Sequence, residues 1–198
     1  MNHLYEIFAD LLEYPGDDWG RQLESFERRM IAESEGLATR SPGFCRKIEG
    51  CSVAELQEKY TQTFDLNPVC ALEIGYHLFG ENYKRGLFLA NLRETESPYD
   101  LGQQHQLPDY LPVLLRLLVR LDDAELRSAL ITECMIPAIE KMVNALEEVD
   151  SPYADLLAVI EKTLKIEAPQ YSAGPHLADY NEAMPRLYSI SSRAATRW

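Results

Sequence analysis

The stretch from residue 60 to residue 89 constrains the fold most, because it combines regularly spaced aromatic residues with two helix-breaking sequences. Its aromatic residues, which recur at helical spacings, are Tyr60, Phe64, Tyr76, Phe79, Tyr83 and Phe88. Residues 65–68 (DLNP) form the first break, since Asp and Asn bond their own backbone and Pro lacks a donor. Residues 80–82 (GEN) form the second, because Gly after an apolar helical run favours a left-handed stop. The stretch therefore predicts the end of one helix, a complete short helix and the start of a third.

Helix-start signals recur elsewhere in the chain. Ser52 and Glu55 have the spacing of a capping box, in which each side chain bonds the other's backbone N–H. Asp122 and Glu125 make a similar pair at the start of a helical pattern that continues to about residue 149. Pro137 lies inside this pattern and is expected to kink or divide the helix.

Residues 107–121 read LPDYLPVLLRLLVRL, which predicts an irregular turn followed by a helix from about Leu111. This helix is apolar on almost every side, so it belongs in the centre of a bundle. The chain shows no internal repeat and no convincing strand alternation. We therefore expect an all-α fold, a single globular bundle of about eight helices over residues 1–167. Residues 168–198 contain Pro, Gly and Arg and are expected to form an extended, locally basic tail.

The charge and the cysteines limit the classes of function. With 198 residues and a formal net charge of −13, the chain lacks the basic surface that displaces phosphate counterions, which argues against nucleic-acid binding. An acidic surface is compatible with a cationic partner and also with simple solubility. The four cysteines show neither a C-x-x-C pair nor zinc-finger spacing to His, and no apolar run reaches membrane-spanning length. These features predict a cytoplasmic protein without a structural disulfide and without stable membrane insertion.

Catalytic and metal-binding motifs are missing from the sequence. It has no G-x-S-x-G elbow, no P-loop and no G-x-G-x-x-G, and its four His residues are scattered singly. Glu73 and His77 are four residues apart and miss the E-x-x-H spacing of a di-metal bundle. A lone His in an apolar helix is more often a partly buried, hydrogen-bonded ring than a ligand. We therefore expect no enzyme activity and no metal site.

Five short motifs occur in an order that resembles a known family. They are L-L-x-Y-P at 11–15, Y-x-x-x-F-D at 60–65, G-x-x-x-x-R-G at 80–86, L-P-D-x-L-P at 107–112 and P-Y-x-x-L-L at 152–157. Each is weak alone, but the ordered set is similar to the NarJ-like, nitrate reductase delta-subunit branch of the TorD/DmsD redox-enzyme maturation chaperones. The chain departs from the family at Tyr110, where L-P-D-H-L-P is usual. Tyr does not titrate near neutral pH, so a pH-linked or metal-linked role at this position is doubtful.

The resemblance implies a function and a set of binding residues. It implies a non-catalytic chaperone that binds the N-terminal, twin-arginine-like segment of the apo catalytic subunit of a molybdenum oxidoreductase. Such a chaperone supports insertion of molybdopterin guanine dinucleotide into its client, binds no cofactor tightly itself, and has cofactor-biosynthesis proteins as further candidate partners. The expected peptide-binding residues are Tyr60, Phe64, Asp65, Asn67, His77, Tyr83, Arg85, Asp109 and Tyr110. Core packing is the alternative role for the aromatic residues, and an internal salt bridge is the alternative for Arg85. For the polar groups at helix-breaking turns, the alternative is turn capping; they are Asp65, Asn67, Asp109 and Tyr110. A generic helical adaptor, or less favourably a metal-binding bundle, remains the alternative function.

Overall fold

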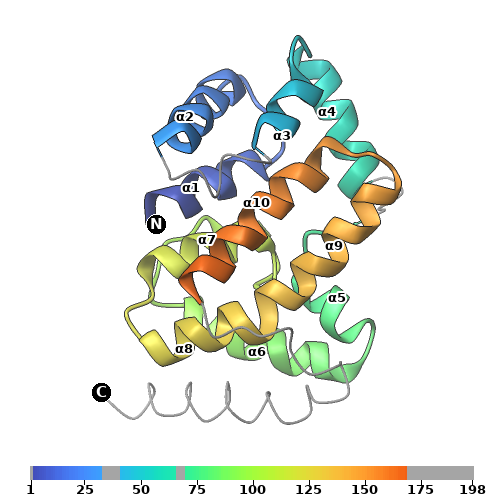
Figure 1. Cartoon of the computed structure of the whole chain (residues 1–198). Helices are drawn as coiled ribbons and strands as arrows, with labels where there is room; N and C mark the ends of the chain where they lie inside the picture. Colours follow the sequence, from blue (N-terminus) through green and yellow to red (C-terminus); the bar gives the residue numbers. More distant parts are fainter. Residues whose placement is uncertain (1, 33–40, 66–69, 169–198) are drawn as a thin grey trace.

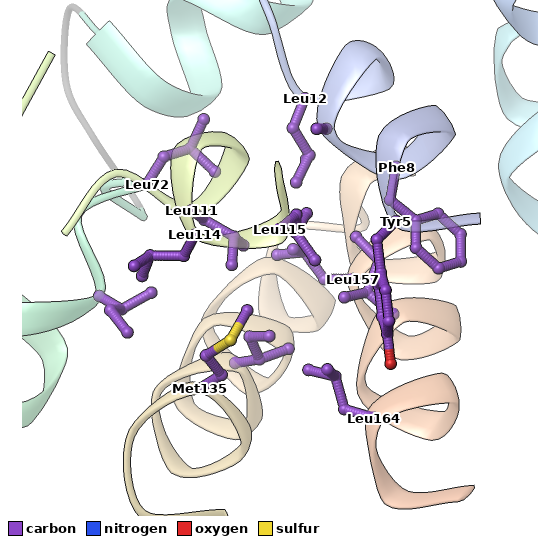
Figure 2. Close-up of a cluster of buried hydrophobic side chains, with 14 of the residues drawn as sticks. Tyr5, Phe8, Leu12, Leu72, Leu111, Leu114, Leu115, Met135, Leu157 and Leu164 are labelled. Carbon is purple, nitrogen blue, oxygen red and sulfur yellow. The ribbon is translucent and has the colours of Figure 1, made fainter. Parts of the chain in front are cut away.

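Helix α7 (Leu111–Arg120) lies in the interior, as its apolar sequence predicts. The computed structural model describes residues 2–32, 41–65 and 70–168. Seven of the ten residues of α7 are buried, and the helix packs along α1 (Asn2–Leu11). Figure 2 shows side chains of both helices, such as Phe8 of α1 and Leu111 and Leu115 of α7, in one cluster with Leu157. The core therefore joins the two ends of the described chain.

The remaining helices complete an all-α bundle, which confirms the predicted fold class. They are α2 (Trp19–Ala32), α3 (Ser41–Ile48), α4 (Val53–Tyr60), α5 (Ile74–Phe79), α6 (Tyr83–Glu96), α8 (Ala124–Ala129), α9 (Ile136–Glu148) and α10 (Pro152–Glu167). Short π-helical segments follow α4 (Thr61–Asp65) and α8 (Leu130–Met135), and a 3₁₀ turn spans Gln103–His105. Within the described ranges, no β-strand longer than an isolated bridge occurs.

Local sequence signals explain where several helices begin and end. The Ser52 hydroxyl accepts a bond from the Glu55 N–H, and the Glu55 carboxylate accepts one from the Ser52 N–H at 2.7 Å, so the predicted capping box is present. Gly80 ends α5 with a positive φ of 59°, as expected for this residue type. At the start of α8 the cap is Asp123 and not Asp122, because the Asp123 carboxylate accepts the N–H groups at the helix start.

Pro137 divides the long helical pattern, as predicted. The π-helical segment at 130–135 lies immediately before it, and α9 then continues to Glu148. Pro137 has no N–H to bond the carbonyl of Glu133, and its ring crowds that carbonyl, so the regular α-helical ladder cannot continue through it. The division of this pattern into α8 and α9 adds a helical segment, in the described ranges, to those that the sequence predicted.

Helix α10 forms the centre of the arrangement in Figure 1. It packs against α9 and α3, while α1 packs between α7 and α2. Helices α5 and α6 pack on each other, and α5 also packs on α9. In the view of Figure 1, α2, α3 and α4 therefore lie at the opposite end of the molecule from α5 and α6.

Two sequence predictions concern the ends of the chain and the membrane. All of the predicted tail except Ala168 lies outside the described residues, so the boundary at residue 167 stays a prediction. Among the helices that the structure describes, none has both the length and the apolar character needed to cross a membrane.

Candidate functional site

An isolated antiparallel bridge joins the two sequence regions that were expected to act together. It pairs Glu73, just before α5, with Tyr110, just before α7. The Ile74 N–H donates to the Asp109 carbonyl at 2.9 Å, and the Leu111 N–H donates to the Leu72 carbonyl at 2.9 Å. The central stretch and the 107–112 turn are thus adjacent in space, which places most of the predicted binding residues in one region.

Asp109 and Arg85 form an internal ion pair next to this bridge. The Arg85 Nε and Nη2 atoms each lie 3.1 Å from Asp109 Oδ2. Asp109 is fully buried, and its second oxygen, Oδ1, has no hydrogen-bond partner among the described residues. Burial raises the pKa of Asp109, and the Arg85 guanidinium opposes this rise. Arg85 therefore has the internal salt bridge that was one of its two expected roles.

Gly75 in the first turn of α5 makes room for this ion pair. A Cβ atom at this position would lie 2.6 Å from Asp109 Oδ2 and 3.1 Å from Phe88 Cδ1. Both distances are too short for unstrained packing. The absence of a side chain at Gly75 lets the carboxylate approach the helix backbone closely.

Tyr60 and Tyr110 form a second polar contact on the other side of the bridge. Their hydroxyl oxygens lie 3.2 Å apart; the Tyr60 hydroxyl oxygen also lies 3.2 Å from the Leu12 carbonyl oxygen, and that of Tyr110 lies 3.3 Å from Glu13 Oε2. Each hydroxyl has a single proton, so a hydrogen bond between the two leaves only one of them to donate to its other acceptor. Both side chains are buried, and burial raises the pKa of Tyr60 to about 12. The Tyr60 ring packs on Phe64, with 4.9 Å between ring centroids. These hydroxyls stay neutral at physiological pH and hold α1 against the 107–112 turn.

The sequence did not single out the charged residues that surround Tyr110. Arg116 of α7 donates from Nη1 to Glu13 at 2.8 Å and from Nη2 to Asp10 at 3.0 Å. Arg120, one turn further, donates to Glu6 at 3.0 Å. Their spacing in the sequence could have indicated them. The acidic residues 6, 10 and 13 are three or four positions apart, and so are the arginines 116 and 120, which is the spacing of one face of a helix.

His77 is a hydrogen-bonded, partly buried ring, as its apolar surroundings suggested. Its Nε2 atom lies 2.7 Å from the Ala71 carbonyl oxygen, and Lys141 donates to the His77 carbonyl at 2.6 Å. Burial lowers the pKa of His77, so the ring is neutral at pH 7. In residues 2–32, 41–65 and 70–168, no group of three or more His, Cys, Asp or Glu side chains could hold a metal ion.

The predicted binding residues fall into a buried set and an exposed set. Tyr60, Phe64, Asp109 and Tyr110 are buried, and Arg85 is partly covered. Tyr83 is 76% exposed and Asp65 is exposed, whereas Asn67 lies outside the described residues. Two further exposed apolar side chains, Tyr76 of α5 and Leu87 of α6, lie on the same pair of helices as Tyr83. Among the described members of the predicted set, Tyr83 and Asp65 are the most accessible to an external peptide in this conformation.

The Tyr60–Tyr110 contact leads to a first prediction. Tyr60→Phe and Tyr110→Phe should each lower the free energy of unfolding by about 1 kcal/mol, because each removes buried hydrogen bonds. The double variant should lose less than the sum of the two, since the hydroxyls interact directly. Urea unfolding of the four proteins measures this coupling, with Tyr99→Phe as a control whose hydroxyl has no described partner. Strict additivity would contradict a direct contact.

Comparisons with known proteins match this chain over most of its length. The family model described as "Nitrate reductase delta subunit" matches residues 32–159. The "probable nitrate reductase molybdenum cofactor assembly chaperone NarJ" of Bacillus subtilis (strain 168) is 30% identical over 164 residues, which are 81% of this chain and 88% of that protein. The "nitrate reductase molybdenum cofactor assembly chaperone NarJ" of Escherichia coli (strain K12) is 27% identical over 179 residues, 87% of this chain and 74% of that protein.

Proposed function

The chain belongs to the nitrate reductase delta-subunit family, and on that basis we propose that it is an assembly chaperone for a nitrate reductase or a related molybdoenzyme. The observation that carries this proposal is the match to two proteins named as molybdenum cofactor assembly chaperones over more than four-fifths of the chain. Both relatives are named as chaperones and not as enzymes, in agreement with a non-catalytic protein. The cofactor it serves is then molybdopterin guanine dinucleotide of the client, and the chaperone acts in the cytoplasm before export or membrane attachment.

The finer proposal concerns how the client is held. We propose that the N-terminal segment of the client's apo catalytic subunit binds across α5 and α6, where Tyr76, Tyr83 and Leu87 are exposed. Exposed aromatic side chains of this kind anchor a peptide helix or an extended segment. Asp65 and Glu81 are exposed carboxylates in the same part of the sequence, and they suit a segment that carries arginine.

The buried members of the predicted set have a supporting role in this proposal. The Arg85–Asp109 ion pair links α6 to the 107–112 turn, and the Glu73–Tyr110 bridge links that turn to the start of α5. These contacts fix the positions of α5 and α6 relative to α7. A binding surface built in this way is ordered before the client arrives, which lowers the entropic cost of binding.

A titration of the full chain tests this function. The probe is a synthetic peptide of the first residues of the nitrate reductase catalytic subunit from the same organism, measured by calorimetry. We expect saturable binding that weakens with salt, because acidic groups contribute to it. Tyr83→Ala should weaken binding about fivefold or more, since truncating an anchoring aromatic residue costs upwards of about 1 kcal/mol. Asp65→Asn should reduce both the affinity and its salt dependence.

Val149→Ala serves as the matched control, because Val149 is an exposed apolar residue at the end of α9. It should bind the peptide as the natural chain does. Unchanged affinity in Tyr83→Ala and Asp65→Asn would place the peptide elsewhere. Absence of binding by any N-terminal peptide to the folded protein would reject this mode of client recognition and favour an adaptor with another partner.

A further inference from the structure

A hollow lies between α2 and α3, on a part of the molecule that carries none of the described peptide-binding candidates. Its volume is about 760 Å³, and its lining includes the apolar side chains of Trp19, Met30, Ile31 and Ile48. Ile31, on the wall contributed by α2, is 84% exposed, so the hollow continues into apolar surface that the described residues leave uncovered. Such a surface is unfavourable in water and is stabilised when another segment covers it.

Trp19 supplies a hydrogen-bond donor without an acceptor in this hollow. The residue is only 3% exposed, and its Nε1 atom has no partner in the part of the chain that the structure describes. Its ring packs on that of Phe44, with 6.5 Å between centroids. A buried N–H without an acceptor is unfavourable and is rare in folded proteins. A backbone carbonyl of a covering segment would provide the missing acceptor.

The charges on the lining indicate the sign of the segment that suits the hollow. Glu27 and Glu49 line it together with one cation, Arg46. The Cys45 thiol bonds to Glu27, and burial raises the pKa of this thiol to about 12, so Cys45 adds no charge. The net charge of the lining is therefore negative, like that of the whole chain at −13. A basic segment suits it, whereas a second copy of the acidic body is repelled.

Residues 183–198 have the charge and the apolar content that this hollow requires. They read AMPRLYSISSRAATRW, with three arginines and no acidic residue. Their large apolar side chains are Met184, Leu187, Tyr188, Ile190 and Trp198. Residues 33–40 (ESEGLATR) are nearer to α2 in sequence, but two glutamates against one arginine give them the same sign of charge as the hollow. Charge complementarity therefore favours residues 183–198.

The end of α10 is close enough for residues 183–198 to reach the hollow. Asp155 in the first turn of α10 lies 3.2 Å from the Lys47 ammonium of α3, so the start of α10 is beside α3. From Asp155 to Ala168 the helix axis extends about 20 Å, at about 1.5 Å per residue. Residues 169–182 can span up to about 46 Å when extended, at about 3.3 Å per residue. This length exceeds the distance back along α10 to α3.

We propose that residues 183–198 of the same chain occupy the hollow between α2 and α3. Their apolar side chains cover Ile31, their arginines lie near the glutamates of the lining, and one of their backbone carbonyls accepts from Trp19 Nε1. A tethered segment competes well with any separate polypeptide, because its linker keeps it at an effective concentration on the order of millimolar. The contact goes beyond the proposed function and involves no client: it covers an apolar surface of the chain with the chain's own residues.

Photo-crosslinking in the full chain tests where residues 183–198 lie. Tyr188 is replaced by p-benzoylphenylalanine, which reacts with nearby C–H bonds and prefers methionine, and the products are mapped by mass spectrometry. We expect cross-links within one chain to the α2 peptide that contains Met30 and Ile31. Ile31→Glu should lower their yield at least about fivefold, since a charge placed against apolar side chains costs more than about 1 kcal/mol. Ile166→Glu is the matched control, because Ile166 is an exposed isoleucine of α10 that does not line the hollow.

The Trp19 indole N–H gives a second test that leaves the hollow itself unchanged. The chain has two tryptophans, so the indole resonance that Trp198→Phe retains in ¹⁵N-labelled protein is that of Trp19. Replacing Arg186, Arg193 and Arg197 together by glutamate, with Trp198 kept, gives the segment the sign of charge of the hollow. The Trp19 resonance should then move upfield and exchange faster with solvent, because Nε1 loses its acceptor. Replacing the same arginines by lysine keeps the charge and should leave the resonance in place.

Three outcomes would overturn this contact. Cross-links that join two chains would assign the hollow to a second copy. Absence of any cross-link from position 188 to α2 or α3 would leave the hollow open to a separate polypeptide. A Trp19 resonance that stays in place when the arginines become glutamates would show that residues 183–198 do not supply its acceptor. Peptide binding at Tyr83 is measured separately, so the proposed function can stand while this contact fails.

Discussion

Arg85→Met is expected to lower the free energy of unfolding at pH 7 by about 3–5 kcal/mol, which is the usual effect of removing one partner from a buried ion pair. Asp109 is fully buried, and the Arg85 guanidinium contacts its Oδ2 atom through both Nε and Nη2. Methionine keeps the length and the apolar stem of Arg85 but donates nothing to Asp109. The Asp109 carboxylate would then be buried without its cationic partner, next to Glu73, whose pKa burial also raises.

The size of this loss should depend on pH. Burial raises the pKa of Asp109 in the folded protein above its unfolded value, and Arg85 is the largest opposing influence. Without Arg85 this folded-state pKa rises further. A group with a raised folded-state pKa contributes its stability in full below the unfolded pKa, about 3.9 for Asp, and loses it as pH rises through the folded pKa. The difference between Arg85→Met and the natural chain should therefore be small near pH 4 and largest above neutrality.

Urea unfolding at several pH values measures this difference. Arg120→Met is the matched control, because Arg120 pairs with Glu6 at the surface, and its loss should stay below about 1 kcal/mol. Adding Asp109→Asn to Arg85→Met removes the buried charge and should abolish the pH dependence of the loss. An Arg85→Met penalty that matches the Arg120→Met penalty at every pH would contradict the buried ion pair.

The parts of the fold that could be predicted are those decided by neighbours in sequence. Ser52 and Glu55 predict the start of α4, because a capping box involves residues of only one helical turn. Gly80 predicts the end of α5, because this helix stop also depends only on residues close in sequence. The apolar sequence of α7 predicted its central position, since a helix without a polar face must be covered on all sides. Pro137 predicted a division, but not the π-helical form that the backbone adopts before it.

The parts that could not be predicted depend on distant residues. Nothing in the sequence pairs Arg85 with Asp109, 24 positions away, or Tyr110 with Glu13, 97 positions away. Both pairs are created by the packing of α1, α6 and α7, so the sequence indicated residues of interest without showing which are buried. Tyr110 illustrates the difference, because its aromatic ring suggested recognition and its hydroxyl is enclosed by Tyr60 and Glu13.

The hollow between α2 and α3, which is lined in part by Trp19, Leu23 and Met30, was missed for a related reason. Trp19, Leu23 and Met30 follow the apolar face of α2, and such a face predicts core packing. Trp19 and Met30 are indeed buried, but Ile31 is not, and α3 leaves part of this side of the helix uncovered. Whether an apolar helix face is fully covered depends on the length and position of the neighbouring helix, which periodicity does not encode.

The second large effect is expected for Phe44→Ala, which should lower the free energy of unfolding by about 3–5 kcal/mol. Phe44 is fully buried on α3 and lies among rings from two other helices. Its ring centroid is 6.0 Å from those of Phe26 on α2 and Tyr153 on α10. Helices α2 and α10 are also held by other packing partners, so they cannot move inward to fill the space that the ring leaves. The cavity would therefore persist and add to the loss of buried apolar area.

Phe79→Ala is the matched control for this substitution, because Phe79 on α5 is only partly buried and packs on Phe88 at 5.4 Å between centroids. Its expected loss is clearly smaller, since solvent can occupy part of the vacated space. Urea unfolding with an unchanged slope would assign both losses to the folded state. Phe44 also packs on Trp19, with 6.5 Å between ring centroids, so Phe44→Ala should broaden the Trp19 indole resonance while Phe79→Ala leaves it sharp. A loss below about 1 kcal/mol for Phe44→Ala would mean that α3 is not part of the cooperative core.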